Sequence, residues 1–504
     1  MKKNYIALVI PVAALALTSC IHGTKKENSK TGFVKIDDVT LVSSDLKASY
    51  APSKGAVKML VIPIAFTGTA KDADSAKYTD WNEDNLGNMY DYYFGESSSL
   101  STYYATASLN NVQVSGKVTD VYENSTIKTS TILEDNTFAS LWDMIEDAIS
   151  WVCDNDESIN WSEYDLNQDG CIDNIHLITN YTAANEEWGQ PLWPHMYYTG
   201  RTGTVEKPMA NVYSISGIGF VEDPYTAIHE QGHIFGLEDY YDYTEDSQLD
   251  YVGQLDMQSY TVFDWNSFSK LSMGWVKPYV INGEANTTTV NIKAASINGD
   301  CILVPADYST WNGSAFDEYF LIELFAPYGN NKKDWPEYQN SLGARGGIRV
   351  YHVDARVYGG NTYEYFGDED YEEDEKIVVT NMEEQQINTK DDVAKWNTVA
   401  KGATNSSLWH RYPGGISQLA DYPLLSIVQK GGDFTFAQQN GRHTLNSSDL
   451  FKVGDEFTWE KYSKFLNKNG EKQELTNKGE VFPYKFVIDY LDEDDATITF
   501  TKVK

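Results

Sequence analysis

The sequence predicts an α+β fold in which a mixed half is followed by a β-rich half. Between residues 140 and 152, apolar side chains recur at three- and four-residue spacings, which is the pattern of an amphipathic helix. The apolar run at residues 59–66 is typical of a buried strand, although Pro63 within it indicates a sheet edge or a bulge. After Trp275 the chain changes to short segments rich in β-branched and aromatic residues, which favours a β-sandwich-like unit.

These patterns divide the chain into four parts. Residues 1–19 are a predicted signal peptide, residues 20–54 a polar tether, residues 55–280 a mixed domain and residues 281–504 the β-rich domain. In the mixed domain we expect helix within residues 84–105 and a strand at 112–121. The strands expected in the β-rich domain are residues 287–294, 301–305, 319–325, 347–353, 484–490 and 496–503.

The N-terminus carries a targeting pattern. Lys2 and Lys3 precede an apolar run at residues 6–17 that is too short to span a bilayer comfortably, so a signal peptide is favoured over a transmembrane helix. Leu17-Thr-Ser-Cys20 resembles a bacterial lipobox, which implies cleavage before Cys20 and a lipid on its sulfur. The alternative is an ordinary signal peptide with an incidental cysteine.

Composition excludes several classes of function. The 504 residues include 74 acidic and 39 basic side chains, and the formal charge of −35 repels nucleic acid and anionic membranes. We therefore expect an extracytoplasmic protein that touches the membrane only through the lipid on Cys20 and has no nucleic-acid partner. Beyond Cys20 only Cys153, Cys171 and Cys301 remain, which allow at most one disulfide, so stability must come mainly from packing.

The residues with the clearest chemistry lie in one predicted helix. Asp223 is a good N-cap, Pro224 suits the first helical position, and Gly236 can end the helix in a left-handed conformation. In His229-Glu-Gln-Gly-His233 the two histidines are four residues apart and therefore share a face. Two imidazoles at this spacing can bind one Zn²⁺, with Glu230 beside them as a general base. The alternative is a surface helix with two unrelated histidines.

Residues that follow this helix complete the predicted zinc site. Asp239, six residues after His233, is the predicted third ligand, and Glu238 is a competing carboxylate one residue off that spacing. Met257 could form a hydrophobic floor beneath the metal. Tyr260 could stabilise an oxyanion, although a rim or core tyrosine needs no such role. Three ligands leave a coordination position for water, as in catalytic zinc sites.

The spacing His-Glu-x-x-His-x-x-Gly-x-x-Asp is similar to that of a metzincin, with Asp in the place of the commoner third His. Over residues 58–354 the chain resembles the immune inhibitor A family of secreted bacterial metallopeptidases. This resemblance implies a metzincin-like core, zinc-dependent endopeptidase activity and zinc ligands at His229, His233 and Asp239. A departure is Leu255-Asp-Met-Gln258, where the family more often has Trp before the Asp and Ser after the Met. The stretches that carry the resemblance are residues 59–66, 103–108, 165–170, 193–195, 229–242, 270–275, 319–323 and 347–354.

A second metal site is predicted upstream of the zinc helix. Oxygen ligands at alternate positions, with Gly170 at the sixth, describe a calcium loop, although His176 stands where an EF-hand has Glu. The alternative is a turn that leads into a strand and needs no ion. The predicted calcium ligands are Asp165, Asn167, Asp169, the backbone carbonyl of Cys171, and Asp173.

The sequence therefore predicts a zinc-dependent endopeptidase, lipid-anchored outside the cytoplasm, that cleaves protein or peptide substrates and also binds Ca²⁺. His195 in Trp193-Pro-His195 could line the cleft or be a structural, hydrogen-bonded histidine. One alternative function is an inactive surface lipoprotein that binds protein or glycan through its β-rich half. Another is a module whose zinc is purely structural.

Overall fold

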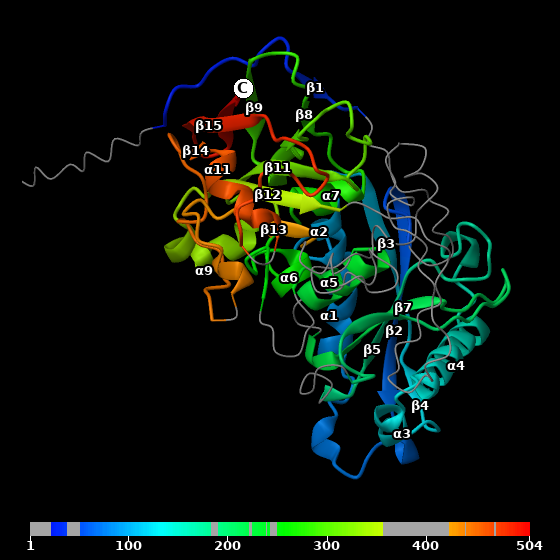
Figure 1. Cartoon of the computed structure of the whole chain (residues 1–504). Coiled ribbons are helices and arrows are strands. Elements are labelled where there is room, and N and C mark those ends of the chain that lie inside the picture. Colours follow the sequence, from blue (N-terminus) through cyan, green and yellow to red (C-terminus); the bar gives the residue numbers. More distant parts are fainter. Residues whose placement is uncertain are drawn as a thin grey trace, which may run out of the picture.

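The structure, a computed structural model, describes residues 22–37, 51–182, 190–220, 224–237, 239–241, 249–355, 423–438, 440–467 and 470–503. Over these residues the protein is a mixed α/β fold built on three β-sheets (Figure 1). The predicted signal peptide, Cys20, Asp223 and Glu238 lie outside them. Within the described residues, no helix is long and apolar enough to cross a membrane.

The first half contains a largely parallel sheet in the order β3-β2-β5-β7-β6, with β4 also pairing with β2. Only β6 runs antiparallel to its neighbour. The strands are β2 (Gly55–Phe66), β3 (Val112–Val118), β4 (Tyr122–Asn124), β5 (Ile175–Thr179), β6 (His195–Tyr198) and β7 (Val212–Gly217).

Helices cover both faces of this sheet, as a parallel sheet requires. Val57, Met59 and Val61 of β2 belong to one hydrophobic cluster, shared with the helices α1 (Glu83–Phe94), α2 (Leu100–Ala107) and α5 (Tyr225–Ile234). The alternate residues Leu60 and Ile62 belong to a second cluster, shared with α4 (Ala139–Asn155). Strand β2 therefore has α5 on one side and α4 on the other (Figure 1).

The edge position or bulge predicted from Pro63 is wrong, because β2 pairs on both sides. On one side β5 pairs with β2 from Leu60 to Ile64; on the other, β3 pairs as far as Val61 and β4 starts at Ile64. The N–H of Leu60 donates to Asn174 on the β5 side, and N–H groups alternate sides along a strand. Position 63 therefore faces the gap between β3 and β4, where no partner needs an N–H.

The second half contains two sheets. The larger has the order β1-β8-β10-β11-β12-β13 and the smaller the order β14-β15-β16-β9. The larger sheet is built from β1 (Phe33–Lys35), β8 (Tyr279–Ile281), β10 (Cys301–Val304), β11 (Glu318–Phe325), β12 (Gly347–Asp354) and β13 (Leu425–Ile427). The smaller is built from β9 (Thr287–Lys293), β14 (Glu456–Phe457), β15 (Tyr484–Leu491) and β16 (Asp495–Lys502).

The larger of these sheets is the middle layer of this half. Phe320 and Ile322 of β11 belong to a cluster shared with the smaller sheet, including Phe486 and Ile498. Their neighbour Leu321 belongs to another cluster, formed with residues that follow α5, such as Tyr240, Leu255 and Phe263. One face of the sheet therefore packs against the segment that carries the predicted metal site.

Residues 22–37 do not form the free tether that composition predicted. Strand β1 pairs antiparallel with β8, Ser29 N–H donates to Thr289 O over 2.9 Å, and Leu491 N–H donates to His22 O over 3.0 Å. Gly23 has φ +74°, and a Cβ there would lie 1.9 Å from the carbonyl oxygen of Asp489. Backbone pairing, which composition does not reveal, therefore fixes this segment against the second half.

The remaining helices connect and cover these sheets. The amphipathic helix predicted at 140–152 is confirmed as α4, and its predicted apolar positions are all buried. The predicted strands of the second half are confirmed, whereas the 12-residue helix α9, which contains Pro336, was not predicted. The other helices are α3 (Thr129–Glu134), α6 (Met257–Tyr260), α7 (Ser267–Ser272), α8 (Ala295–Asn298), α9 (Asn331–Leu342) and α11 (Trp459–Tyr462).

Candidate metal centre

Helix α5 presents the two predicted histidine ligands. Its first helical bond runs from Ile228 N–H to Pro224 O over 2.8 Å, so Pro224 is the N-cap and the helix begins at Tyr225, one residue later than predicted. The predicted glycine stop is confirmed, because Gly236 has φ +91° and the next N–H, that of Leu237, returns to Gly232 O. This turn lets the chain double back towards the helix.

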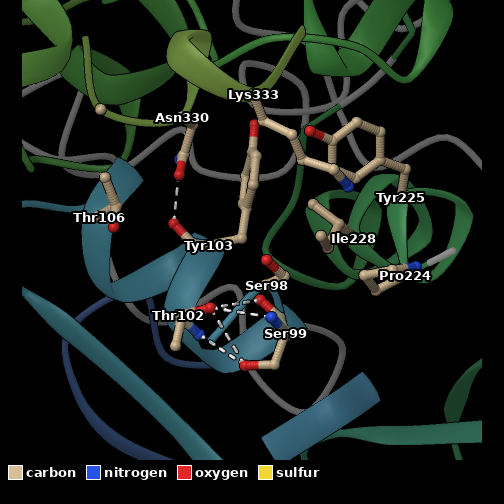
Figure 2. Close-up of a pocket in the computed structure, with 11 residues that line it drawn as sticks. Ser98, Ser99, Thr102, Tyr103, Thr106, Pro224, Tyr225, Ile228, Asn330 and Lys333 are labelled. Atoms are coloured by element: carbon tan, nitrogen blue, oxygen red, sulfur yellow. Dashed lines mark hydrogen bonds between the residues drawn. The ribbon is translucent and has the colours of Figure 1, made fainter. Parts of the chain in front are cut away.

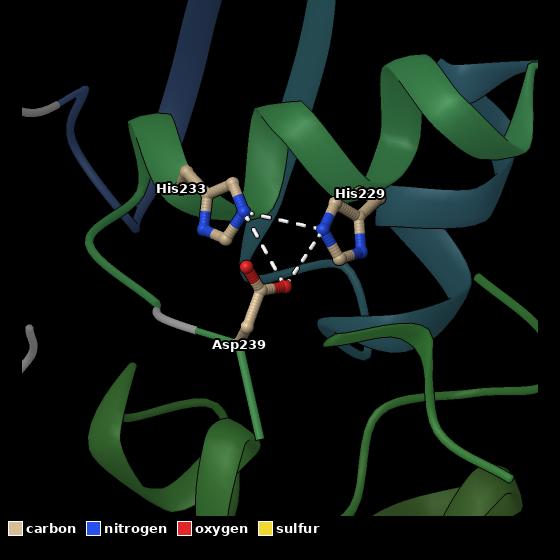
Figure 3. A group of neighbouring side chains, drawn as sticks. All are labelled: His229, His233 and Asp239. Carbon is tan, nitrogen blue, oxygen red and sulfur yellow. Dashed lines mark hydrogen bonds and ion pairs between the residues drawn. The ribbon is translucent and has the colours of Figure 1, made fainter. Parts of the chain in front are cut away.

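The chain returns so that Asp239 meets both histidines (Figure 3). The Nε2 atoms of His229 and His233 are 3.2 Å apart, and Oδ1 of Asp239 lies 2.9 Å from the first and 3.7 Å from the second. All three residues are less than 9% exposed. Among the described residues, they form the one group of three His, Cys, Asp or Glu side chains close enough to hold a metal ion.

Backbone carbonyls fix the orientation of both imidazoles. Nδ1 of His229 lies 2.7 Å from Met257 O, and Nδ1 of His233 lies 2.6 Å from Leu237 O. A carbonyl oxygen only accepts, so each Nδ1 must carry the proton, and each Nε2 lone pair turns towards Asp239. Two atoms bound about 2.0–2.1 Å from a tetrahedral ion lie about 3.4 Å apart, so the observed spacing fits zinc.

These facing lone pairs and the carboxylate repel one another unless a cation or a proton lies between them. Burial disfavours a charged His229, but the adjacent carboxylate of Asp239 outweighs burial and raises its pKa to about 9. For His233, burial prevails and lowers the pKa. In the metal-free protein, a proton on His229 therefore satisfies the group.

Glu230 is buried next to this group. Its side chain is 5% exposed, and Oε2 has no hydrogen-bond partner within the described residues. Burial raises its pKa to about 8, with opposing contributions from nearby His229 and Asp239. A carboxyl with a pKa near neutrality can both take up and return a proton.

Tyr241 is a site residue that the sequence reasoning missed. Burial raises its pKa, as does a hydrogen bond with Asp239. The sequence could have predicted this position. Residues two apart in an extended segment lie on the same side, and Tyr241 follows Asp239 by two. Tyr260, the tyrosine proposed from sequence, is 57% exposed and lies near Tyr241 at the surface.

Other predicted site residues have different positions. Met257 is fully buried, and its backbone carbonyl is the partner of His229. His195 contacts Trp193 O over 2.7 Å and the Tyr213 hydroxyl over 3.0 Å, which favours the structural role. The competing ligand Glu238 lies outside the described residues.

The predicted calcium loop is a closely bonded turn. The two carboxylate oxygens of Asp165 accept the N–H groups of Asp169 and Gly170 over 3.0 and 2.9 Å, and Asp169 Oδ1 accepts Cys171 N–H over 2.9 Å. Asn167 donates from its amide to Asp169 Oδ2 over 2.8 Å. Backbone and amide donors therefore already occupy several of the predicted ligand oxygens.

Asp173, two residues before β5, closes the loop. Its Oδ2 accepts Leu166 N–H over 2.9 Å. Burial, together with the nearby carboxylates of Asp165 and Asp169, raises its pKa to about 6, against the effect of that hydrogen bond. Calcium binding here remains a prediction.

A separate cavity of about 260 Å³ lies at the N-terminal end of α5 (Figure 2). Tyr103 of α2 and the N-cap of that helix, Ser99, line it. Ile228 of α5, the N-cap Pro224 and Lys333 of α9 line it as well. His229, His233 and Asp239 do not line it, so it is not part of the metal-binding group.

No model of a known protein family matches the sequence, and no curated protein matches it either. The case for a function therefore rests on the residues and their geometry.

Proposed function

We propose that this protein is a zinc-dependent endopeptidase with a metzincin-like core similar to that of the immune inhibitor A family, followed by a β-sandwich-like half. The observation that carries the proposal is the buried group of His229, His233 and Asp239, with Glu230 beside it. Both imidazoles already have the tautomer that zinc binding needs.

The chain's own residues would divide the work as follows. His229, His233 and Asp239 would hold Zn²⁺. A bound zinc ion lowers the pKa of water to about 7 and polarises the scissile carbonyl. Glu230 would take a proton from the attacking water and deliver it to the leaving amine; the burial that raises its pKa makes the deprotonated carboxylate a stronger base.

The alternatives fit the residues less well. An inactive binding protein has no need of a buried carboxylate at Glu230, and burying its Oε2 without a hydrogen-bond partner is unfavourable. A structural zinc site usually has four protein ligands. Among the described residues this group offers three, which leaves a position for water.

The test is Glu230→Gln in the full chain. This variant keeps the ligands but removes the base, so we expect unchanged zinc content and casein hydrolysis reduced by about 10²–10⁴-fold. Exposed Glu157 provides the matched control, Glu157→Gln, which should retain activity. A chelator should abolish wild-type activity, and added zinc should restore it. Undiminished turnover by Glu230→Gln with full zinc content rules out this role.

The proposal places the enzyme outside the cytoplasm, anchored by lipid on Cys20, because Leu17-Thr-Ser-Cys20 resembles a lipobox. We expect the mature chain to begin at Cys20 and to carry acyl groups. Mass spectrometry of the N-terminal peptide measures both. An unmodified Cys20, or cleavage elsewhere, removes the anchor.

A further inference from the structure

A buried ion pair in the second half faces the predicted metal site. Glu323 on β11 and Arg349 on β12 are direct cross-strand partners, and both are at most 3% exposed. Nε and Nη2 of Arg349 lie 2.6 and 2.5 Å from Glu323 Oε1. Their strand neighbours Leu321 and Tyr351 belong to the cluster that packs against the segment after α5. Burying two charges destabilises a fold unless hydrogen bonds satisfy them. The other hydrogen-bond partners of Glu323 and Arg349 therefore show which part of the structure the pair holds.

Glu323 binds the residue that opens α7. Its Oε2 accepts both the N–H and the hydroxyl of Ser267, over 2.8 and 2.5 Å. The preceding residue, Asn266, donates its N–H and its side-chain amide to Asp256 Oδ2, each over 2.8 Å. Glu323 is therefore linked, through two consecutive residues, to the segment that contains Met257.

Arg349 reaches the same segment directly. Its Nη1 donates to Leu255 O over 3.2 Å, and its guanidinium lies 3.9 Å from the centre of the Phe325 ring. Two residues of the larger sheet thus hold residues 255 and 256 in place: Arg349 bonds Leu255 directly, and Glu323 is linked to Asp256 through residues 266 and 267. The next carbonyl along the chain, that of Met257, accepts the Nδ1 proton of His229 over 2.7 Å.

The segment from Gln254 to Phe263, which contains α6, adopts a backbone conformation that its surroundings must hold in place. Gln254, Thr261 and Phe263 all have φ between +52° and +64°, a conformation that non-glycine residues adopt only when their surroundings impose it. We propose that Arg349, held by Glu323, is a positioning residue that fixes the Met257 carbonyl and, through it, the His229 imidazole. This inference rests on the proposed zinc site. It makes the second half a working part of the metal centre.

A merely structural ion pair is the competing explanation, and the same two strands provide a control for it. His352 on β12 contacts Glu318 on β11 over 3.0 Å and is 1% exposed. It packs against Phe320, on the sheet face turned away from Met257. Arg349→Met and His352→Gln each disrupt one buried pair. Only the Arg349–Glu323 pair contacts the segment that contains Met257.

The experiment compares these variants as folded full-length proteins. Zinc affinity, measured by competition with a chromophoric chelator, should fall about 10–100-fold in Arg349→Met, the usual effect of losing an outer partner of a ligand, and stay unchanged in His352→Gln. In metal-free protein labelled with ¹⁵N-histidine, the His229 Nδ1–H resonance should shift or broaden only in Arg349→Met. Arg349→Lys should have a zinc affinity between those of the wild type and Arg349→Met. Lysine keeps the positive charge but lacks the branched guanidinium that bonds both Glu323 and Leu255.

The two readouts separate the possible failures. A wild-type protein that binds no zinc overturns the proposed function. An unchanged His229 resonance in Arg349→Met, or equal loss of zinc affinity in both variants, overturns the positioning role. If Arg349→Met does not fold, Ser267→Ala removes one donor to Glu323, and it should lower zinc affinity a few-fold and shift the same resonance. No effect of Ser267→Ala on either readout then contradicts the inference.

Discussion

The group at His229, His233 and Asp239 and the loop at residues 165–173 both match metal-binding patterns in the sequence, yet their ligand atoms are occupied differently. At the first, two Nε2 lone pairs and a carboxylate converge, and a proton on His229 or a cation satisfies the group. At the second, Asp165 and Asp169 already accept backbone N–H groups.

This difference in hydrogen bonding shows that the spacing of ligands in a sequence motif is not enough to identify a metal site. Ligand spacing gives the positions of donor atoms, but the other hydrogen bonds of those donors decide whether an ion is needed. In the zinc-type group, backbone carbonyls take up the Nδ1 protons and leave Nε2 facing inwards. In the loop at residues 165–173, backbone N–H groups already bond the carboxylate oxygens of Asp165 and Asp169, so binding an ion would stabilise these oxygens less.

The largest expected effect comes from the third ligand of the first group. Asp239→Ala removes the only carboxylate that converges on both histidines within the described residues, so we expect zinc affinity to fall by more than about 100-fold. Glu238→Ala is the matched control and should bind zinc as the wild type does. Chelator competition measures both. The reverse result would make Glu238 the third ligand and the arrangement in Figure 3 wrong.

The fold was predictable where local pattern and burial agree. Helix α4 followed from the spacing of its apolar residues, because a single buried face determines it. Pro63 misled because its effect depends on where the neighbouring strands end. Residues 22–37 misled because strand pairing through the backbone leaves little trace in a polar sequence.

The metal ligands of the site were predictable from the sequence, whereas the distant residues that support them were not. His229, His233 and Asp239 lie within eleven positions of the chain, so one helix and one turn bring them together. Glu323 and Arg349 lie far along the chain and act on this segment only through sheet packing. No local pattern in a single sequence connects them to Met257.

The smaller expected effect concerns calcium at the loop. If Ca²⁺ binds Asp165, Asn167, Asp169, Asp173 and the carbonyl of Cys171, a hundredfold excess of free calcium over its dissociation constant should stabilise the zinc-loaded protein by about 2.7 kcal/mol. Asp169→Asn is a discriminating variant. It keeps an oxygen that can accept Cys171 N–H but removes the charge, so the turn should survive while calcium binding weakens.

Thermal melts of wild type and Asp169→Asn across a calcium titration, with zinc saturating, measure this effect. We expect the melting temperature of the wild type to rise with calcium and that of Asp169→Asn to rise far less. In calcium-depleted buffer with no calcium added, the two proteins should melt within a few degrees of each other. A wild type that does not respond to calcium shows that the backbone bonds alone satisfy these carboxylates. The loop is then a turn leading into β5, and the contrast with the His229 group becomes that between a metal site and a sequence pattern that only resembles one.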